Sequence, residues 1–405
     1  MPLNDAQVLT VALATWFGGS LSLVGSSILI YITIMQNKSD GYHRFLLGLS
    51  IADLFHTVGW MLGPLAVPRE TTDRFIALGN HQSCSATGFL LQLGASSYLY
   101  NAMLSIYFVL VIRHGMASNR LVLLEWIMHG ITILFGFGTA TLGLFLNVYN
   151  EVAVGALCWI AETPLDCSTR DDLDCNEMAN VQVVGYLFGL VPMMSVPIVV
   201  VCNILIYCKV RSTEQASQRH DRSTHSLFTE SSLSAQTARA TRTRKVAQQA
   251  FLYVTAFFNC LLWTIVVRNL GAWHVARREN EGTFFVPILL AQLSSPSQGF
   301  FNLLVYVRPR YLSIRERYNY ESRLGALYMS LLGAPGHRQR PNKTSVAASF
   351  NDEGEIGGHR SPRRRSITSI VLLEESYDDL EALRPPTTRQ CKEARFAEIP
   401  FIHAI

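Results

Sequence analysis

Residues 178–208 read MANVQVVGYLFGLVPMMSVPIVVVCNILIYC, a stretch without a single Asp, Glu, Lys or Arg. It is longer than the ~20 residues that an α-helix needs to cross the hydrocarbon core of a bilayer. A core helix of a soluble protein would show a polar face every 3.6 residues, and this stretch shows no such face. Because backbone groups in lipid must pair within their own segment, the stretch is predicted to be a transmembrane helix.

The same pattern recurs along the chain, in which 49% of the residues are hydrophobic and only 16% are charged. Soluble domains contain about a quarter charged residues. Further charge-free stretches lie between Asp5 and Lys38, Arg74 and Arg113, Glu125 and Glu151, Lys245 and Arg268, and Glu281 and Arg308, and one between Arg44 and Arg69 is interrupted at Asp53. We therefore expect an all-α membrane protein, a bundle of seven transmembrane helices at about 8–35, 45–67, 84–112, 121–147, 180–208, 246–270 and 283–307.

The charges of the loops predict the orientation of this bundle, because cytoplasmic loops are enriched in Lys and Arg. The predicted loops after the first, third and fifth helices are basic, whereas the loop at 151–177 contains seven acidic residues and one Arg. We expect the short N-terminus (1–7) outside the cell, the C-terminus in the cytoplasm and the protein in the plasma membrane. The net charge of +4 belongs to these loops and does not indicate a nucleic-acid partner.

Two polar regions are predicted on the cytoplasmic side. Residues 209–245 are rich in Ser, Thr, Gln and Arg, which predicts a loop with a flexible middle. Its last part, 237–249, is basic and contains no helix breaker, so it should extend the sixth helix into the cytoplasm. Residues 333–405 are rich in Gly, Pro, Ser and charge and are predicted to be a disordered tail. In this tail Ser366 follows three arginines, so it is a candidate site for a basophilic kinase; the alternative is that the arginines bind anionic membrane lipids.

The segment after the seventh helix is predicted to lie on the membrane. Pro309 disfavours helical geometry at Arg308, so the chain should turn there. The region 308–332 then mixes apolar and basic residues, which is typical of a short helix at the membrane surface with its arginines toward the lipid headgroups.

Four cysteines fall on the predicted outer side, where disulfides form. A bond between Cys84 and Cys158 would hold the loop after the fourth helix over the mouth of the bundle, and Cys167 and Cys175 would close a small acidic loop. Free thiols and other pairings stay open, since four cysteines allow three connectivities.

One acidic residue, Asp53, interrupts a predicted span, where a carboxylate costs a few kcal/mol unless it faces polar partners or water. Asn302 and Tyr306 lie four residues apart on one face of the seventh helix. The three residues are predicted to form a polar switch cluster. The alternative is a hydrogen-bond network that only stabilises the fold.

The motifs resemble those of rhodopsin-like G-protein-coupled receptors. Leu49–Leu54 (Leu-Ser-Ile-Ala-Asp-Leu) is similar to their second-helix motif, and Asn302–Tyr306 resembles their Asn-Pro-x-x-Tyr motif with Leu in place of Pro. Val24-Gly25-Ser26 resembles the first-helix Gly-Asn, Trp126 the fourth-helix tryptophan, and Cys84 with Cys158 the disulfide of the family. The resemblance covers about residues 8–318.

Other features are more similar to another group of G-protein-coupled receptors, the cyclic-AMP-receptor-like group. They are the segment from Cys84 to Gln92, the Cys158-Trp159 pair and the run from Ser295 to Asn302. Two departures from the rhodopsin-like pattern agree with this: Phe108-Val109-Leu110 occupies the place of the third-helix Asp-Arg-Tyr, and the sixth helix has Trp263 without a proline.

The resemblance implies a cell-surface receptor that responds to an extracellular ligand and activates a heterotrimeric G protein, without enzymatic activity, metal or cofactor. A retinal-binding receptor is excluded, because no Lys lies within a predicted span. The alternative function is a small-solute or proton-coupled transporter or channel that uses Asp53. Polar and aromatic residues at outer or middle depth are the ligand-pocket candidates: Trp60, Gln92, Tyr98, Trp263 and Gln292. Basic residues on the predicted cytoplasmic side are the candidates for contact with the G protein: Arg113, Arg120, Arg242, Arg244 and Lys245.

Overall fold

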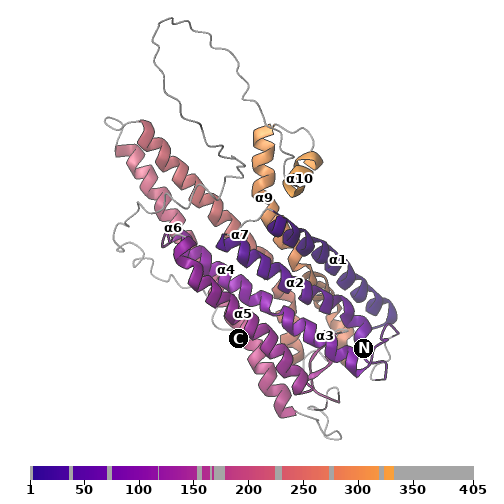
Figure 1. The fold of residues 1–405 in the computed structure, drawn as a ribbon. Helices are drawn as coiled ribbons and strands as arrows, with labels where there is room; N and C mark the ends of the chain where they lie inside the picture. Colours follow the sequence, from indigo (N-terminus) through magenta and orange to yellow (C-terminus); the bar gives the residue numbers. More distant parts are fainter. Residues whose placement is uncertain are drawn as a thin grey trace, which may run out of the picture.

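The chain folds into a bundle of long, roughly antiparallel helices (Figure 1). The computed structural model describes residues 3–35, 40–70, 75–116, 118–152, 157–164, 167, 178–223, 230–272, 278–318 and 323–332. Six helical stretches among these residues are long and apolar enough to cross a membrane. A seventh is divided into shorter pieces, and with it the predicted seven-helix membrane fold is confirmed.

The seven spans follow one another along the chain. The first two are α1 (Asp5–Met35) and α2 (Gly41–Ala66). The third consists of α3 (His81–Gly94) and α4 (Ser96–Ile112), and the fourth is α5 (Ser118–Phe145). The fifth and sixth are α6 (Met178–Ser223) and α7 (Glu230–Ala272). After η2 (Arg278–Phe284), the seventh consists of α8 (Phe285–Ser294), η3 (Ser295–Ser297) and α9 (Gln298–Tyr318), and α10 (Arg323–Leu332) follows.

The third and seventh spans are interrupted where they approach other helices closely. At the end of α3, a Cβ on Gly94 would lie 2.3 Å from the backbone nitrogen of His56 in α2. Only a residue without a side chain permits this approach, and the helix restarts one residue later. In the seventh span, Pro296 lies in the 3₁₀ turn η3, because proline cannot donate to the helical hydrogen-bond ladder.

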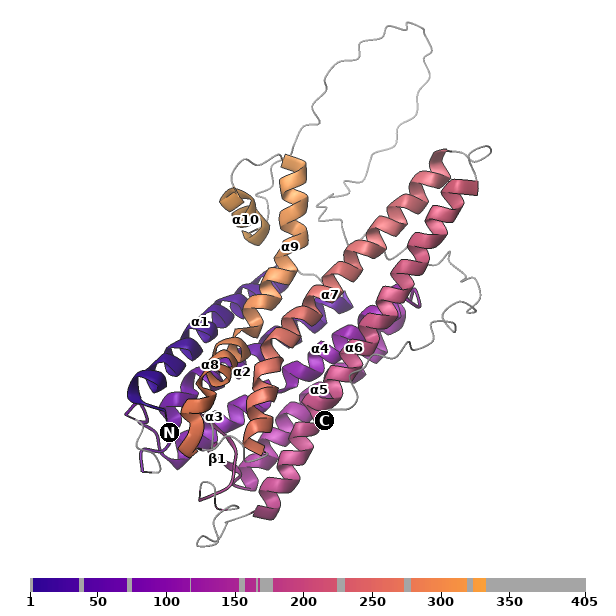
Figure 2. The same cartoon turned by 180° about the vertical axis from the view of Figure 1, so that it is seen from behind.

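The fifth and sixth spans are longer than predicted. α6 continues to Ser223 and α7 begins at Glu230, and in Figures 1 and 2 the two helices project together beyond the rest of the bundle. The predicted loop over 209–245 is therefore helical at both ends, up to Ser223 and from Glu230, and its middle at 224–229 lies outside the described residues; the predicted extension of the sixth helix is present. The physical reason is that no Gly or Pro occurs between Pro197 and Gly271, so both helices can continue into the polar stretch.

The predicted turn at Pro309 is also absent. α9 continues as a helix through Pro309 to Tyr318, and the separate short helix of this region is α10, which contacts α9 and α1. A proline inside a helix costs one backbone hydrogen bond, and neighbouring groups in a bundle tolerate this loss. The tail from residue 333 onward, with Ser366, lies outside the described residues.

A two-stranded hairpin follows the fourth span. Strands β1 (Tyr149–Glu151) and β2 (Cys158–Ile160) are antiparallel, with Asn150 opposite Trp159. We call the end of the bundle that carries this hairpin the hairpin end. The opposite end, where α1 ends at Met35, α2 begins at Gly41 and α9 runs out toward Tyr318, is called the tail end.

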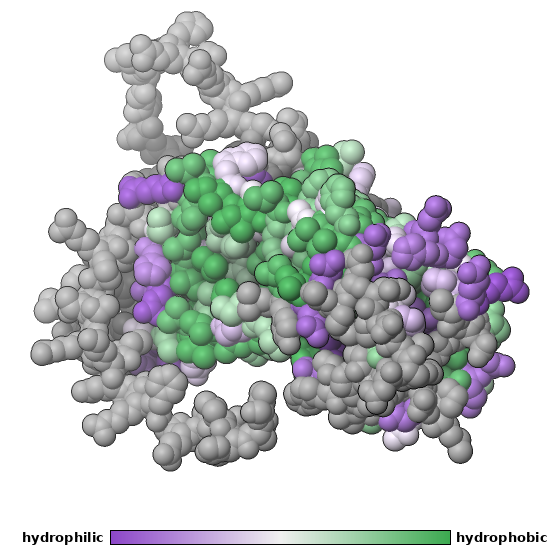
Figure 3. Space-filling model, turned by 90° about the horizontal axis from the view of Figure 1, so that it is seen from below, coloured by the Kyte–Doolittle hydropathy of each residue, from purple (hydrophilic) through white to green (hydrophobic). Residues whose placement is uncertain are grey.

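The outer surface of the bundle is apolar. Large side chains of α5 are highly exposed, with Leu123 at 74%, Leu134 at 75% and Phe145 at 81%. In Figure 3, hydrophobic residues cover the middle of the visible face and hydrophilic ones gather toward its two sides. A water-soluble protein does not expose a continuous apolar surface of this kind, so the surface is one that faces lipid.

Candidate functional site

Asp53 lies in the centre of a polar cluster between α2 and the seventh span. Its carboxylate is 1% exposed and accepts two hydrogen bonds, from Gln298 Nε2 at 2.9 Å and from Asn302 Nδ2 at 2.7 Å. Hydrogen bonds to a charged oxygen are among the stronger ones in proteins, about 1.5–3 kcal/mol each. The carboxylate therefore ties α2 to α9 near the break at η3.

The cluster continues into α1 through small polar side chains. Ser22 Oγ lies 2.9 Å from Thr57 Oγ1 and accepts a hydrogen bond from the backbone N–H of Gly299 at 3.0 Å. Thr57 also donates to the carbonyl of Pro296 at 3.3 Å. The helices approach closely here, since a Cβ on Gly299 would lie 2.0 Å from Ser26 Oγ. Polar groups of α1, α2 and α9 thus share one buried, tightly packed junction.

The structure brings Asp53 and Asn302 together as predicted but does not make Tyr306 a hydrogen-bond partner of Asp53. The Tyr306 ring packs edge-on against His43, with 6.1 Å between ring centroids. The second partner is Gln298, which the sequence interpretation missed. The signal was available, because Gln298 stands four residues before Asn302 and shares its helix face.

Four of the five predicted ligand-pocket residues are buried toward the hairpin end or the middle of the bundle, and each makes a hydrogen bond within the protein. Trp60 donates to His56 Nε2 at 3.0 Å, and the Tyr98 hydroxyl lies 3.4 Å from the same nitrogen. Gln292 accepts from Thr15 at 2.9 Å. The fifth candidate, Trp263, is half-buried in α7.

Gln92, the fourth of the buried candidates, supports the hairpin. It is 1% exposed, accepts a hydrogen bond from Trp159 Nε1 at 3.1 Å and donates to Thr139 Oγ1 at 3.0 Å. The guanidinium carbon of Arg268 in α7 lies 4.3 Å from the centre of the Trp159 ring. An arginine in this position is attracted to the face of an indole, so the hairpin also contacts the sixth span.

The predicted disulfide between Cys84 and Cys158 is present. Both residues are completely buried and pack against Val67 and Ala77, so the bond fixes strand β2 to the start of α3. Cys167 is also disulfide-bonded. Cys175 lies outside the described residues, so the second pairing stays a prediction.

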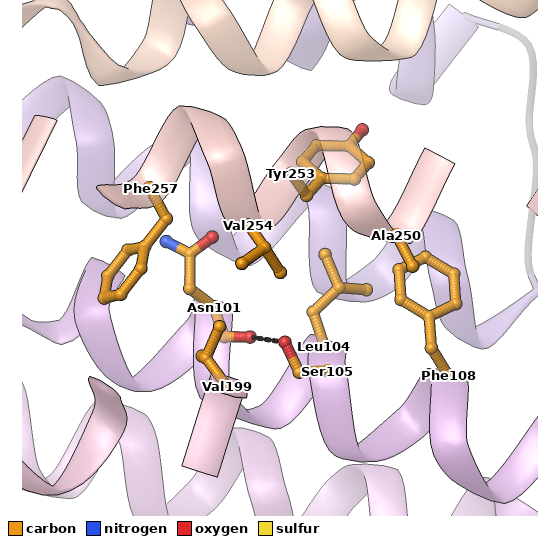
Figure 4. A pocket seen from close by; sticks show the side chains of 9 residues that line it. All are labelled: Asn101, Leu104, Ser105, Phe108, Val199, Ala250, Tyr253, Val254 and Phe257. Carbon is orange, nitrogen blue, oxygen red and sulfur yellow. Dashed lines mark hydrogen bonds between the residues drawn. The ribbon is translucent and has the colours of Figure 1, made fainter. Parts of the chain in front are cut away.

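A small cavity lies deeper in the bundle, among α4, α6 and α7 (Figure 4). Its volume is ≈ 10 Å³, which is room for about one water molecule. Asn101 and Ser105 of α4 and Tyr253 of α7 are among its lining residues, and none of the five ligand-pocket candidates is. In Figure 4 the Tyr253 hydroxyl points away from the other labelled side chains.

The comparisons with known proteins decide the family. The family described as 7 transmembrane receptor (rhodopsin family) matches residues 25–306, which is well over half of the chain. The chain belongs to this receptor family. Members of the family are receptors and not enzymes, which confirms the prediction that the chain is not an enzyme.

Among solved structures, the receptor is similar to squid rhodopsin, with a TM-score of 0.56 and 14% sequence identity over 84% of this chain and 94% of the rhodopsin chain. At this identity the likeness concerns the fold alone. The search among curated proteins found no match.

At the tail end of the receptor, the structure adds an acidic residue that the sequence interpretation did not count. Glu125 lies within α5, is 1% exposed and accepts a hydrogen bond from Arg44 Nε of α2 at 3.0 Å. The prediction that Asp53 is the only acidic residue within a span was therefore wrong. Arg44 and Glu125 are 81 residues apart in sequence, and only the packing of α2 against α5 brings them together.

The basic residues predicted to face a G protein lie at this end as well. Arg113 caps the end of α4, and Arg120 is exposed in the first turn of α5. Arg244 and Lys245 are exposed on α7, and the side chain of Arg242 lies outside the described residues. The tail end thus presents positive charge on three helices.

Proposed function

We propose that this receptor lies in the plasma membrane with its hairpin end outside, and that it converts the binding of an extracellular ligand into nucleotide exchange on a heterotrimeric G protein. The observation that carries the proposal is the Asp53 junction in a chain of the receptor family. A buried carboxylate is costly in a membrane, and such residues mark functional sites. Asp53 joins α2 to the interrupted seventh span, so a rearrangement of either element changes its hydrogen bonds.

The charges and the disulfide support the orientation. The Cys84–Cys158 bond is at the hairpin end, and disulfides form in oxidising surroundings such as the cell exterior. The exposed Arg120, Arg244 and Lys245 are at the opposite end, as the enrichment of basic residues on the cytoplasmic side requires.

We also propose that the receptor belongs to the cyclic-AMP-receptor-like group. Two sequence features of that resemblance meet in space: Trp159, from the Cys-Trp pair, donates a hydrogen bond to Gln92, from the segment that begins at Cys84. The disulfide next to Trp159 fixes this contact. The motif residues therefore act together as one support for the hairpin.

A reconstitution experiment tests the proposed activity. Receptor purified into lipid nanodiscs is mixed with each class of purified G protein, and the rate of GTP loading is compared with that of empty nanodiscs. We expect faster loading for at least one class. A matched variant, with Arg244 and Lys245 replaced by Gln, should keep its thermal stability and lose this acceleration. Equal loading with receptor and with empty nanodiscs for every class would contradict the proposal, and proton flux through the same protein in liposomes would then support the transporter alternative.

A further inference from the structure

The first turn of α2 is a hub at the tail end. Within the segment Asp40–Arg44, consecutive side chains reach different helices. Tyr42 reaches α7, the His43 ring packs against Tyr306 of α9, and Arg44 pairs with Glu125 of α5. His43 is also held by Asp40 in the same turn.

Tyr42 connects this hub to the sixth span by two hydrogen bonds. Its hydroxyl oxygen lies 2.9 Å from the hydroxyl of Tyr253 and accepts a hydrogen bond from Gln249 Nε2 at 2.8 Å. The three residues are 5%, 3% and 8% exposed, so water does not compete for these bonds. Gln249 and Tyr253 stand four residues apart, which places both on one face of α7.

The third span also contacts α7. Phe108 of α4 packs beside Tyr42, with 5.8 Å between ring centroids. The ≈ 10 Å³ cavity lies between α4 and α7 next to Tyr253. The α4–α7 interface is incompletely filled at this cavity, whereas the hydrogen bonds of Tyr42 join α7 directly to α2.

The Arg44–Glu125 pair fixes the hub itself. Glu125 is buried with one oxygen bonded to Arg44, and a Cβ on Gly41 would meet its other oxygen at 1.9 Å. The absence of a side chain at Gly41 thus leaves room for the Glu125 carboxylate between α2 and α5. Because the Glu125 carboxylate is buried, loss of its partner Arg44 would be unfavourable, so the pair holds α2 against α5.

From these contacts we propose that Tyr42, Tyr253 and Gln249 form the latch that holds the tail-end half of α7 against the bundle in the resting receptor. Release of the latch frees α7 to move away from α2. The claim that a G protein responds to this movement rests on the proposed function, whereas the latch itself does not.

Distance measurements test the latch without a G protein. Spin labels are attached to cysteines introduced at Lys245 of α7 and Arg308 of α9, both exposed, after the native free cysteines have been replaced by serine. The distance distribution is recorded in nanodiscs for the parent protein and for Tyr42→Phe and Tyr253→Phe. Tyr149→Phe is the matched control, because it removes one buried hydroxyl that donates to Ala140 at the hairpin end.

We expect Tyr42→Phe to add a longer-distance population and Tyr253→Phe to add a smaller one, because Tyr42 makes two bonds of the latch and Tyr253 one. The double variant should match Tyr42→Phe alone, since the first substitution already breaks the bond between them. Unchanged distances in both latch variants, or the same change in Tyr149→Phe, would overturn the latch.

Nucleotide exchange separates the latch from the proposed function. With a responsive G protein, Tyr42→Phe should raise the basal rate roughly tenfold, which corresponds to about 1.4 kcal/mol. A longer distance without exchange on any G protein would leave the latch in place and contradict the proposed function. If Tyr42→Phe unfolds, Tyr253→Phe decides the question, because it keeps the Gln249–Tyr42 bond.

Discussion

Replacing Asp53 with asparagine separates the hydrogen bonds that the central carboxylate accepts from the cost of its charge in the membrane. In the native protein the two oxygens accept from Gln298 at 2.9 Å and from Asn302 at 2.7 Å. Both partners are amide groups that donate, so the asparagine oxygen can satisfy only one of them and its own NH₂ group faces the other. Two hydrogen bonds to a charged group, about 3–6 kcal/mol together, become one neutral bond of about 1 kcal/mol.

The opposing term is the cost of a charge in the membrane, about 2.5–3.5 kcal/mol near the centre of a span. The two terms nearly cancel, so Asp53→Asn should leave thermal stability and surface expression close to those of the native receptor. The attachment of α2 to α9, however, is weakened. If one of the two conformations, resting or signalling, loses about 2 kcal/mol more of this hydrogen-bond energy than the other, the ratio of their populations shifts roughly thirtyfold.

The assay is basal nucleotide exchange by receptor in nanodiscs, with thermal unfolding measured on the same preparation. The matched rescue is the exchanged pair, Asp53→Asn combined with Asn302→Asp, which restores one carboxylate opposite one amide. We expect a changed exchange rate in the single variant and a rate nearer the native value in the exchanged pair. A single variant with native stability and native exchange would refute the reasoning and leave the cluster with a purely structural role.

Three further outcomes follow from the packing, the disulfide and the tail. Gly299→Ala should destabilise the receptor by about 1–3 kcal/mol in thermal unfolding, because its Cβ has no space beside Ser26, whereas Gly138→Ala, with no atom within 4 Å, should be tolerated. Replacement of Cys84 by serine should cost roughly 4 kcal/mol, as expected for a bond across 74 residues, and the double replacement with its partner should cost no more; additive losses would argue against the pairing. Phosphopeptide mapping of stimulated cells should find Ser366 modified, and normal desensitisation of an unmodified Ser366→Ala receptor would remove the regulatory role.

The charge-free stretches predicted the number and order of the spans, because the cost of burying charge in lipid is large and local in the sequence. The breaks within spans were not predicted. The interruption after Gly94 depends on how closely α3 approaches His56 of α2, a contact between segments 38 residues apart in sequence that no local pattern encodes. Helix boundaries outside the membrane were missed for a different reason: polar composition was taken as flexibility, although no helix breaker was present between Pro197 and Gly271.

The contacts of the candidate site could be predicted where a sequence motif names the two residues that meet. They could not be predicted where the two residues come from helices far apart in sequence. Asp53 and Asn302 meet as the motif resemblance implied. The contacts of Tyr42 with Tyr253 and of Arg44 with Glu125 join helices far apart in sequence, and neither tyrosine carries a signal that distinguishes it from a packing residue. Buried hydroxyl pairs of this kind are found only when the helices are placed side by side.

The continuous length of the sixth span has a mechanical consequence. From Tyr253 back to Glu230, α7 extends roughly 35 Å at 1.5 Å per residue. Once the latch is released, a tilt of this rigid helix by about 10° displaces its far tip by about 6 Å relative to Tyr253. Because no Gly or Pro lies in this part of α7, the helix should bend little as it tilts. A small tilt of α7 thereby becomes a displacement of its tip that is large enough to expose or cover a binding surface for another protein.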